Sequence, residues 1–166
     1  MKKLLTTIAA VGLSAGSASA QTWQTKTGYN EMTDKPQAIL MGFVGDYSWQ
    51  GYILYGCNSQ TEFITVADGG GKKNWLFDAG VLIRKDWDVP REINFLRDDD
   101  NKSNLTLHDY IAQPGEINYI LDAIETAKSR IVISTSDKTF TISAKGSTAA
   151  YNKVKPVCDE LRRGRS

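Results

Sequence analysis

Residues 38–67, AILMGFVGDYSWQGYILYGCNSQTEFITVA, decide the fold class. Three apolar runs rich in β-branched and aromatic residues recur in this stretch, at 38–44, 49–55 and 62–67, with turn-forming residues between them. Such runs, spaced at intervals of about ten residues, are typical of short antiparallel strands. The stretch therefore predicts neighbouring strands of an antiparallel sheet rather than a parallel α/β unit.

The remainder of the chain extends this pattern and adds two helices. Residues 114–128 (PGEINYILDAIETAK) place apolar side chains at helical spacing, and a second helical stretch opens at Ser147. Pro156 inside that stretch removes a helical hydrogen bond, which predicts a kink or two shorter helices. The last residues, 162–166, are rich in arginine and are expected to form a flexible, solvated tail. Further strands are predicted at 80–84, 92–96, 130–135 and 139–143.

The first 20 residues have the three parts of a secretory signal peptide. Lys2 and Lys3 form a positive start, residues 4–13 form a short apolar run, and residues 17–20 (SASA) supply a small-residue cleavage site. The apolar run is shorter than the roughly 20 residues that a membrane-spanning helix needs, so no retained membrane anchor is expected. The segment predicts a bacterial protein that is periplasmic or secreted after cleavage following Ala20. The remaining residues, 21–161, are expected to form a single exported domain.

Cys57 and Cys158 are the two cysteines of the chain. An exported chain meets an oxidising environment, which favours a structural disulfide between them. The alternatives are a redox pair, which usually has Cys-x-x-Cys spacing, and a nucleophilic thiol, which needs a neighbouring base. Neither local signature accompanies these cysteines. The expected fold is thus an α+β domain, mostly an antiparallel β-sandwich with two helical segments and one disulfide.

Composition and motifs exclude several classes of function. The 166 residues carry a formal charge of +1, and without Lys2 and Lys3 there are 18 basic against 19 acidic side chains. A near-neutral chain offers no electrostatic basis for binding nucleic acid. His108 is the single histidine, expected in a surface position or a turn, and it cannot by itself form a His-rich zinc site. No cofactor or metal is expected, because the acidic stretch 98–101 (DDDN) lacks the glycine and the final glutamate of an EF-hand loop.

An aromatic cluster gives the best candidate for a binding surface. Tyr47, Trp49, Tyr52 and Tyr55 lie within nine residues, and Trp75, Phe77 and Trp87 follow. In an extended strand Tyr47 and Trp49 would share one face, and amphipathic aromatics are frequent where proteins bind one another. The alternative is that these rings fill the core of a small sandwich.

Several short motifs resemble the accessory proteins of type VI secretion known as the TagO/VasI family. The resemblance starts with Trp23 and residues 33–35 (TDK), continues through residues 55–61 (YGCNSQT) into the strand EFITV, and ends at residues 157–158 (VC). Tyr-Gly before Cys57 and Asp-Glu after Cys158 depart from the family pattern, and periplasmic proteins of phage or prophage origin share the same plan. The resemblance implies a non-enzymatic envelope protein in which Cys57 and Cys158 are paired.

Together these features lead us to expect an exported binding protein without catalytic residues. Its partner would be another envelope protein or a cell-wall component, with Tyr47 and Trp49 as the first contact pair. Two alternatives stay open: a carboxylate-dependent envelope hydrolase, and a periplasmic inhibitor of a lysozyme-like enzyme, which rests on analogy of fold alone.

Overall fold

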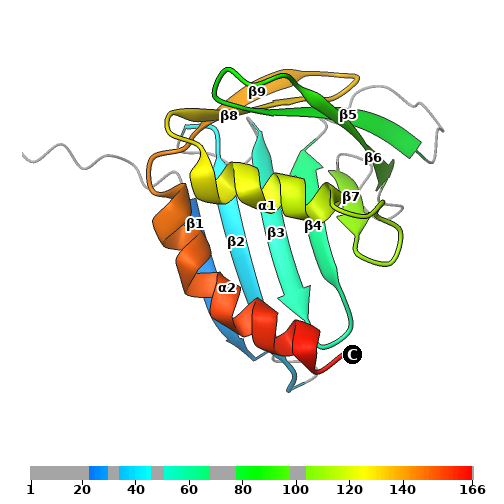
Figure 1. Ribbon diagram of the computed structural model, residues 1–166, viewed down its shortest axis with the longest axis vertical. Helices are drawn as coiled ribbons and strands as arrows, with labels where there is room; N and C mark the ends of the chain where they lie inside the picture. Colours follow the sequence, from blue (N-terminus) through cyan, green and yellow to red (C-terminus); the bar gives the residue numbers. More distant parts are fainter. Residues whose placement is uncertain (1–22, 30–33, 46–50, 68–77, 98–103, 166) are drawn as a thin grey trace, which may run out of the picture.

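The computed structural model describes residues 23–29, 34–45, 51–67, 78–97 and 104–165, and within these ranges the chain forms one antiparallel sheet and two helices. The strands lie in the order β1-β2-β3-β4-β7-β6-β5-β8-β9 (Figure 1). The predicted α+β, mostly β class is confirmed. The elements are β1 (Trp23–Tyr29), β2 (Pro36–Phe43), β3 (Tyr52–Asn58), β4 (Glu62–Ala67), β5 (Asp78–Lys85), β6 (Arg91–Arg97), β7 (Asn104–His108), α1 (Glu116–Thr126), β8 (Arg130–Ser134), β9 (Thr139–Ser143) and α2 (Ser147–Arg163).

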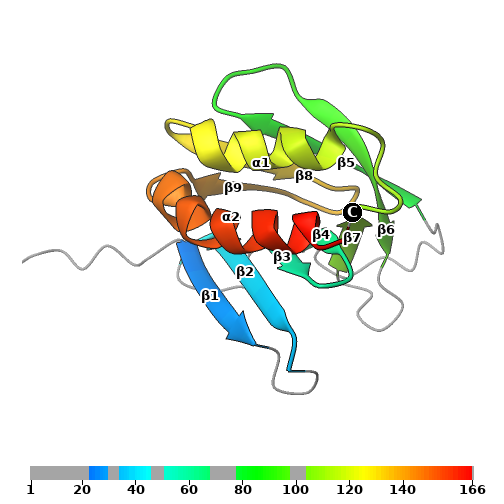
Figure 2. The ribbon, with the colours of Figure 1, turned by 60° about the horizontal axis from the view of Figure 1, so that its bottom comes forward.

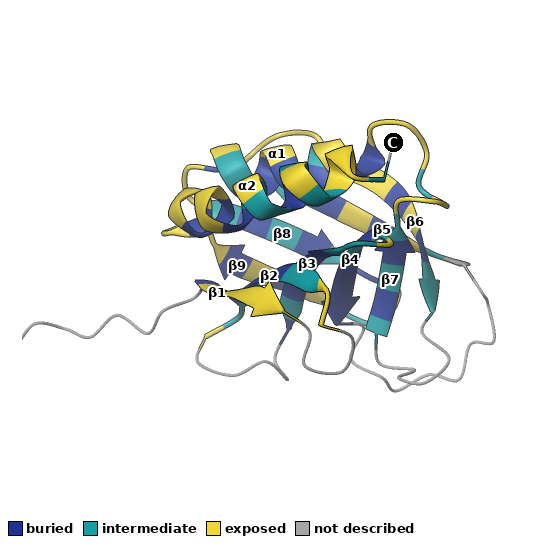
Figure 3. Ribbon diagram, turned by 90° about the horizontal axis from the view of Figure 1, so that it is seen from below, coloured by how far each residue is buried: buried dark blue, intermediate teal, exposed yellow. Residues whose placement is uncertain are grey.

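One face of the sheet carries the core, because inward side chains alternate with outward ones along each strand. Leu40 of β2 lies opposite Tyr55 of β3, Tyr55 lies opposite Ile64 of β4, and Ile64 lies opposite Leu107 of β7. Figure 3 shows the buried residues of these strands in dark blue, beneath the two helices. We define the inner face as the side of the sheet that carries this core, and the outer face as the opposite side.

The sheet curves so far that its two edge strands come together. The indole Nε1 of Trp23 in β1 donates a hydrogen bond of 2.7 Å to the backbone oxygen of Ser143 in β9. At the other end of β9, the ring of Phe140 lies against Gly51, just before β3. The two layers of the predicted sandwich are therefore parts of one continuous sheet whose ends approach each other.

The two helices lie side by side over the inner face (Figure 2). Helix α1 contacts β5, where the Tyr119 hydroxyl donates to the backbone oxygen of Ile83 at 3.1 Å, and α2 packs against β1, β2 and β3. Each helix follows a glycine with positive φ, Gly115 (86°) and Gly146 (90°), a conformation that glycine adopts without a Cβ clash.

Some sequence-based expectations about the strands and helices differ from the structure. Strands β1 and β7 were not predicted. His108, expected in a surface position or a turn, is the half-buried last residue of β7. Of the kink or two shorter helices predicted at Pro156, the division into two helices is wrong, because α2 runs as one helix through Pro156. Pro156 and Asn152, the residue four positions earlier, are both exposed, so water can bond the carbonyl that proline leaves without an intrahelical donor.

Candidate functional site

A buried disulfide fixes α2 to the sheet. Cys57 in β3 and Cys158 in α2 are joined by an S–S bond of 2.01 Å, with their Cα atoms 5.6 Å apart. Each cysteine is about 1% exposed. The predicted pairing is confirmed, and its burial indicates a structural bond rather than a redox-active one, because exchange needs access to an attacking thiolate.

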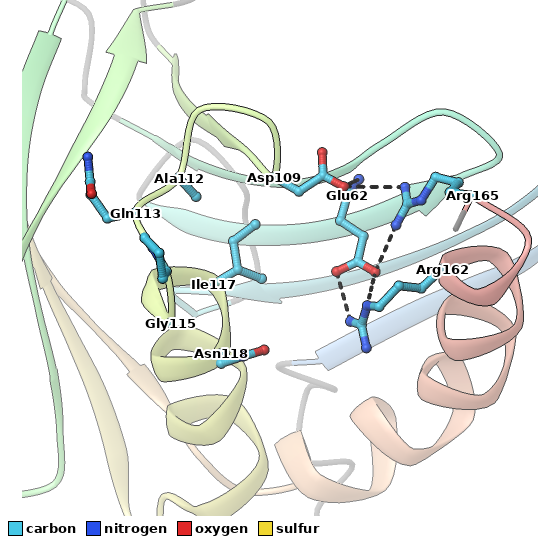
Figure 4. A pocket seen from close by; sticks show the side chains of 10 residues that line it. Glu62, Asp109, Ala112, Gln113, Gly115, Ile117, Asn118, Arg162 and Arg165 are labelled. Atoms are coloured by element: carbon cyan, nitrogen blue, oxygen red, sulfur yellow. Dashed lines mark hydrogen bonds and ion pairs between the residues drawn. The ribbon is translucent and has the colours of Figure 1, made fainter.

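Next to the disulfide, Glu62 holds the C-terminal end of α2. Glu62 opens β4 directly opposite Cys57, and only 3% of the residue is exposed. Its carboxylate accepts from Nε and Nη2 of Arg162 at 2.8 and 2.9 Å and from Nη2 of Arg165 at 3.1 Å (Figure 4). Charge-assisted, paired hydrogen bonds of this kind satisfy a buried carboxylate that would otherwise be costly to desolvate.

Asp109 extends the same network from the end of β7. Its carboxylate accepts from the Thr61 hydroxyl at 2.7 Å and from the backbone N–H of Glu62 at 3.0 Å, and it lies 3.5 Å from Arg165. Arg165 also donates to the backbone oxygen of Asn58 at 3.4 Å. The expectation of a frayed tail is therefore wrong for two of its residues, since the side chains of Arg162 and Arg165 bind the sheet.

These charged groups line one side of an open pocket of about 340 Å³. The opposite side is the N-terminal end of α1 with the loop before it, and its lining includes Gln113, Ile117 and Asn118 (Figure 4). The hydrogen bond to Glu62 raises the pKa of the Arg162 guanidinium above its usual range. Burial, reinforced by the Glu62 charge, raises the pKa of the Tyr55 hydroxyl beyond its usual range, so this phenol stays neutral at physiological pH.

The turn between β5 and β6 forms a second candidate site at the outer edge of the molecule (Figure 2). Asp86 at its start has a φ of 48°, an unfavourable backbone conformation for a residue with a Cβ. Its carboxylate accepts four hydrogen bonds: from the backbone N–H groups of Lys128, Ser129 and Arg130 at 2.8, 2.8 and 3.1 Å, and from the Ser129 hydroxyl at 2.7 Å. The turn is thereby fastened to the segment that leads into β8.

The turn presents apolar side chains to solvent. Trp87 is 79% exposed and Val89 is 85% exposed, while the turn that carries them is closed by a backbone hydrogen bond of 3.0 Å from Asp88 to Lys85. The guanidinium carbon of Arg130 lies 3.7 Å from the centre of the Trp87 ring, a cation–π contact. Trp87 is thus held in place on one ring face by Arg130.

The predicted contact pair is not tested by the structure, because Tyr47 and Trp49 lie outside the described residues. So do Trp75, Phe77 and the acidic stretch 98–101. His108 stacks on Tyr110, with ring centres 4.9 Å apart, and its ring centre lies 6.0 Å from that of Phe63 in a tilted arrangement. Within the described ranges, no three His, Cys, Asp or Glu side chains gather as metal ligands would.

Sequence patterns pointed to some of these groups and missed others. Trp87 was part of the predicted aromatic cluster. The segment 86–90 (DWDVP) also indicates an exposed tryptophan, because Trp87 and Val89 stand among turn-forming residues there. Glu62 and Arg162 are 100 residues apart, so no local motif could have joined them.

Comparison of the chain with protein-family models, with curated proteins and with solved structures finds no match. Neither helix of the described part is long and apolar enough to cross a membrane.

Proposed function

We propose that this chain is an exported, non-enzymatic binding protein that acts through protein–protein contacts in the bacterial envelope. The observation that carries the proposal is the Trp87 turn, in which an exposed tryptophan is fixed by Asp86 and Arg130 instead of being buried. Tryptophan and arginine are enriched among the residues that dominate binding energy at interfaces. Because the turn is already ordered, little conformational entropy would be lost when a partner binds it.

The ion pairs around Glu62 favour binding over the alternative of a carboxylate-dependent hydrolase. Both oxygens of Glu62 are occupied by arginine N–H groups, and Asp109 is occupied by Thr61, Arg165 and the backbone. A general acid or base has to reach its substrate with a free carboxyl oxygen. These carboxylates instead attach the end of α2 and the start of β4 to each other.

Export is the second part of the proposal. A buried disulfide is compatible with an oxidising compartment, and residues 1–20 have the composition of a cleaved signal peptide. The resemblance to the TagO/VasI family suggests that components of a secretion system are the first partners to test.

The test is cross-linked capture from envelope extract, using the full chain expressed with its N-terminal segment and purified from the envelope fraction. A specific partner captured by the wild type and lost with Trp87→Ala supports the proposal. Tyr29→Ala is the matched control, because Tyr29 is 69% exposed on β1, away from the turn. Equal capture by wild type and Trp87→Ala would overturn the assignment of the turn. Turnover of cell wall by the purified chain would favour the hydrolase, and loss of lysozyme activity on titration would favour the inhibitor.

A further inference from the structure

The outer face of the sheet beside the Trp87 turn carries two arginines. In β5, Val81 and Ile83 belong to the core, so Arg84 lies on the outer face, and in β8 Ile131 and Ile133 place Arg130 there in the same way. Arg84 lies opposite Val132 in the sheet, so Arg130 is its diagonal neighbour on the adjacent strand. The Cα atoms of such diagonal neighbours are on the order of 7–8 Å apart. We call Arg84, Trp87 and Arg130 the Trp87 cluster.

The acidic side chains nearby are engaged elsewhere. The carboxylate of Asp86 is occupied by the backbone before β8. Asp88 is exposed in the turn, and its charge helps to raise the pKa of Lys85 and of Tyr119, both of which contact or belong to the α1 side of the sheet. The Asp86 carboxylate keeps its charge beside Arg130, but its oxygens accept from backbone N–H groups and the Ser129 hydroxyl, while Nε of Arg130 donates to the Asp86 backbone oxygen at 3.4 Å. Among the described residues, neither the Arg84 nor the Arg130 guanidinium forms an ion pair with a carboxylate.

Glu92 is the acidic residue of β6 that shares the outer face with Arg84. It lies opposite Leu82 in the sheet, and its side chain lies over Gly80, on the side of Leu82 that faces away from Arg84. The glycine leaves room for this carboxylate, because a Cβ at position 80 would collide with it. Glu92 is thus directed away from the Trp87 cluster.

Arg84 also has an unsatisfied donor. Its Nε is buried and has no hydrogen-bond partner among the residues that the structure describes. A buried N–H without an acceptor costs about 1–3 kcal/mol, so such groups in folded proteins call for an explanation. Because Nε is closed to solvent, a partner does not reach Arg84 through this atom; the residue as a whole is half-buried and contributes to the surface by its place on the outer face.

We propose that the Trp87 cluster binds an acidic peptide segment of the partner protein, an inference that rests on the proposed function. A carboxylate of the segment would lie between Arg84 and Arg130, and an adjacent apolar side chain would pack on Trp87 and Val89. Arginine binds carboxylates through paired N–H donors, and tryptophan supplies a large contact area at low conformational cost. Exposed Val89 and Leu82 beside the cluster favour a peptide over a glycan, because aliphatic side chains offer a hydroxylated sugar few hydrogen bonds.

The experiment is a titration of the full chain, labelled with ¹⁵N, with a defined peptide, acetyl-Gly-Glu-Asp-Leu-Phe-Asp-Gly-amide. The expected result is a shift of the Trp87 indole N–H signal, with binding about tenfold weaker for the peptide whose acids are replaced by Gln and Asn. Arg84→Gln and Arg130→Gln should each weaken binding roughly five- to tenfold. Arg84→Gln is the sharper variant, because Arg84 does not support the Trp87 ring.

Lys153→Gln is the matched control, since Lys153 is an exposed cation on α2 outside the cluster. Equal binding of the acidic and neutral peptides, or equal weakening by Lys153→Gln and Arg84→Gln, would overturn the proposal. So would the same indole shift with a polyanionic glycan such as hyaluronate, which would assign the cluster to cell-surface glycans.

The proposed function and this inference can fail separately. If capture from envelope extract needs Trp87 but the acidic peptide does not bind, the binding function holds and the chemistry assigned to its partner is wrong. If capture does not need Trp87 and the peptide does not bind, both are wrong.

Discussion

Asp86 connects two parts of the chain that are far apart in sequence, through one carboxylate. The residues that donate to it, Lys128, Ser129 and Arg130, lie more than 40 positions later, at the start of β8 and just before it. The donated hydrogen bonds, led by the Lys128 backbone N–H and the Ser129 hydroxyl, hold the pKa of Asp86 well below its usual range. They also offset the left-handed backbone conformation, which costs of order 1–3 kcal/mol for a residue other than glycine.

We predict that Asp86→Asn lowers the melting temperature at pH 7 and that the difference from wild type shrinks in acid. Because the pKa of Asp86 is lower in the folded chain than in the unfolded chain, its stabilisation is complete above the unfolded value and is lost as the pH falls below roughly 4. Asparagine tolerates positive φ, so the variant tests the charge rather than the backbone. Asp88→Asn, in the same turn, is the control. A loss that is independent of pH would contradict the prediction.

Gly42 gives a second prediction for a single residue. The ring of Trp23 lies so close above Gly42 that an added Cβ would come within 2.6 Å of it. Gly42→Ala must therefore displace the indole that bonds Ser143, and overpacking of this kind costs about 1–3 kcal/mol. Urea unfolding measures the loss. Gly164→Ala, where a Cβ would meet only ordinary contacts, should change stability far less.

At the scale of elements, the last turn of α2 depends on β4. Glu62→Gln keeps the shape of the side chain but removes the charge that binds Arg162 and Arg165. One hydrogen bond to a charged group contributes about 1.5–3 kcal/mol, and we expect the free energy of unfolding of the variant to fall by about that amount. Urea unfolding with Lys153→Gln as control provides the measurement, and a loss no larger than that of the control would refute the role of Glu62.

The strands and helices that local periodicity could predict are those with a buried face. The run at 139–143 coincides with β9, where buried and exposed residues alternate strictly, and the run at 62–67 coincides with β4, where all residues but Phe63 are buried. Strand β1 was missed because six of its seven residues are not buried, as befits an edge strand. Strand β7 has five residues and directly follows a polar stretch, so its two inward leucines give too short a pattern.

The candidate sites were harder to predict than the strands because they are made by distant pairings. The placement of β7 beside β4 brings Asp109 to Glu62, and the pairing of β5 with β8 brings Arg130 to Trp87. Residues 86–90 contain a local signal for an exposed tryptophan, but nothing local indicates its arginine. The cysteine pairing was accessible to sequence analysis because the chain offers two cysteines and one possible bond.

For the whole molecule, the disulfide is expected to be a large single contribution to stability. It links residues 101 positions apart, and closing a loop of about 100 residues stabilises by up to about 4.7 kcal/mol in the chain-entropy model. Cys57→Ala with Cys158→Ala should therefore unfold at markedly lower urea concentration than the oxidised wild type. The variant and the wild type reduced in denaturant should behave alike, and a midpoint unchanged by either treatment would contradict this expectation.

The same bond sets an order of events if the chain crosses a membrane from its N-terminus, as proposed. Strands β1 to β4 pair with their neighbours in sequence and emerge first, whereas the partner of Cys57 arrives only with α2. During that interval the Cys57 thiol stands without its helix cover and is open to a mixed disulfide with an oxidase. The arrival of Cys158 would resolve that intermediate, so a Cys158→Ala variant should accumulate as a covalent adduct of the oxidase that can be trapped with acid and seen on a non-reducing gel.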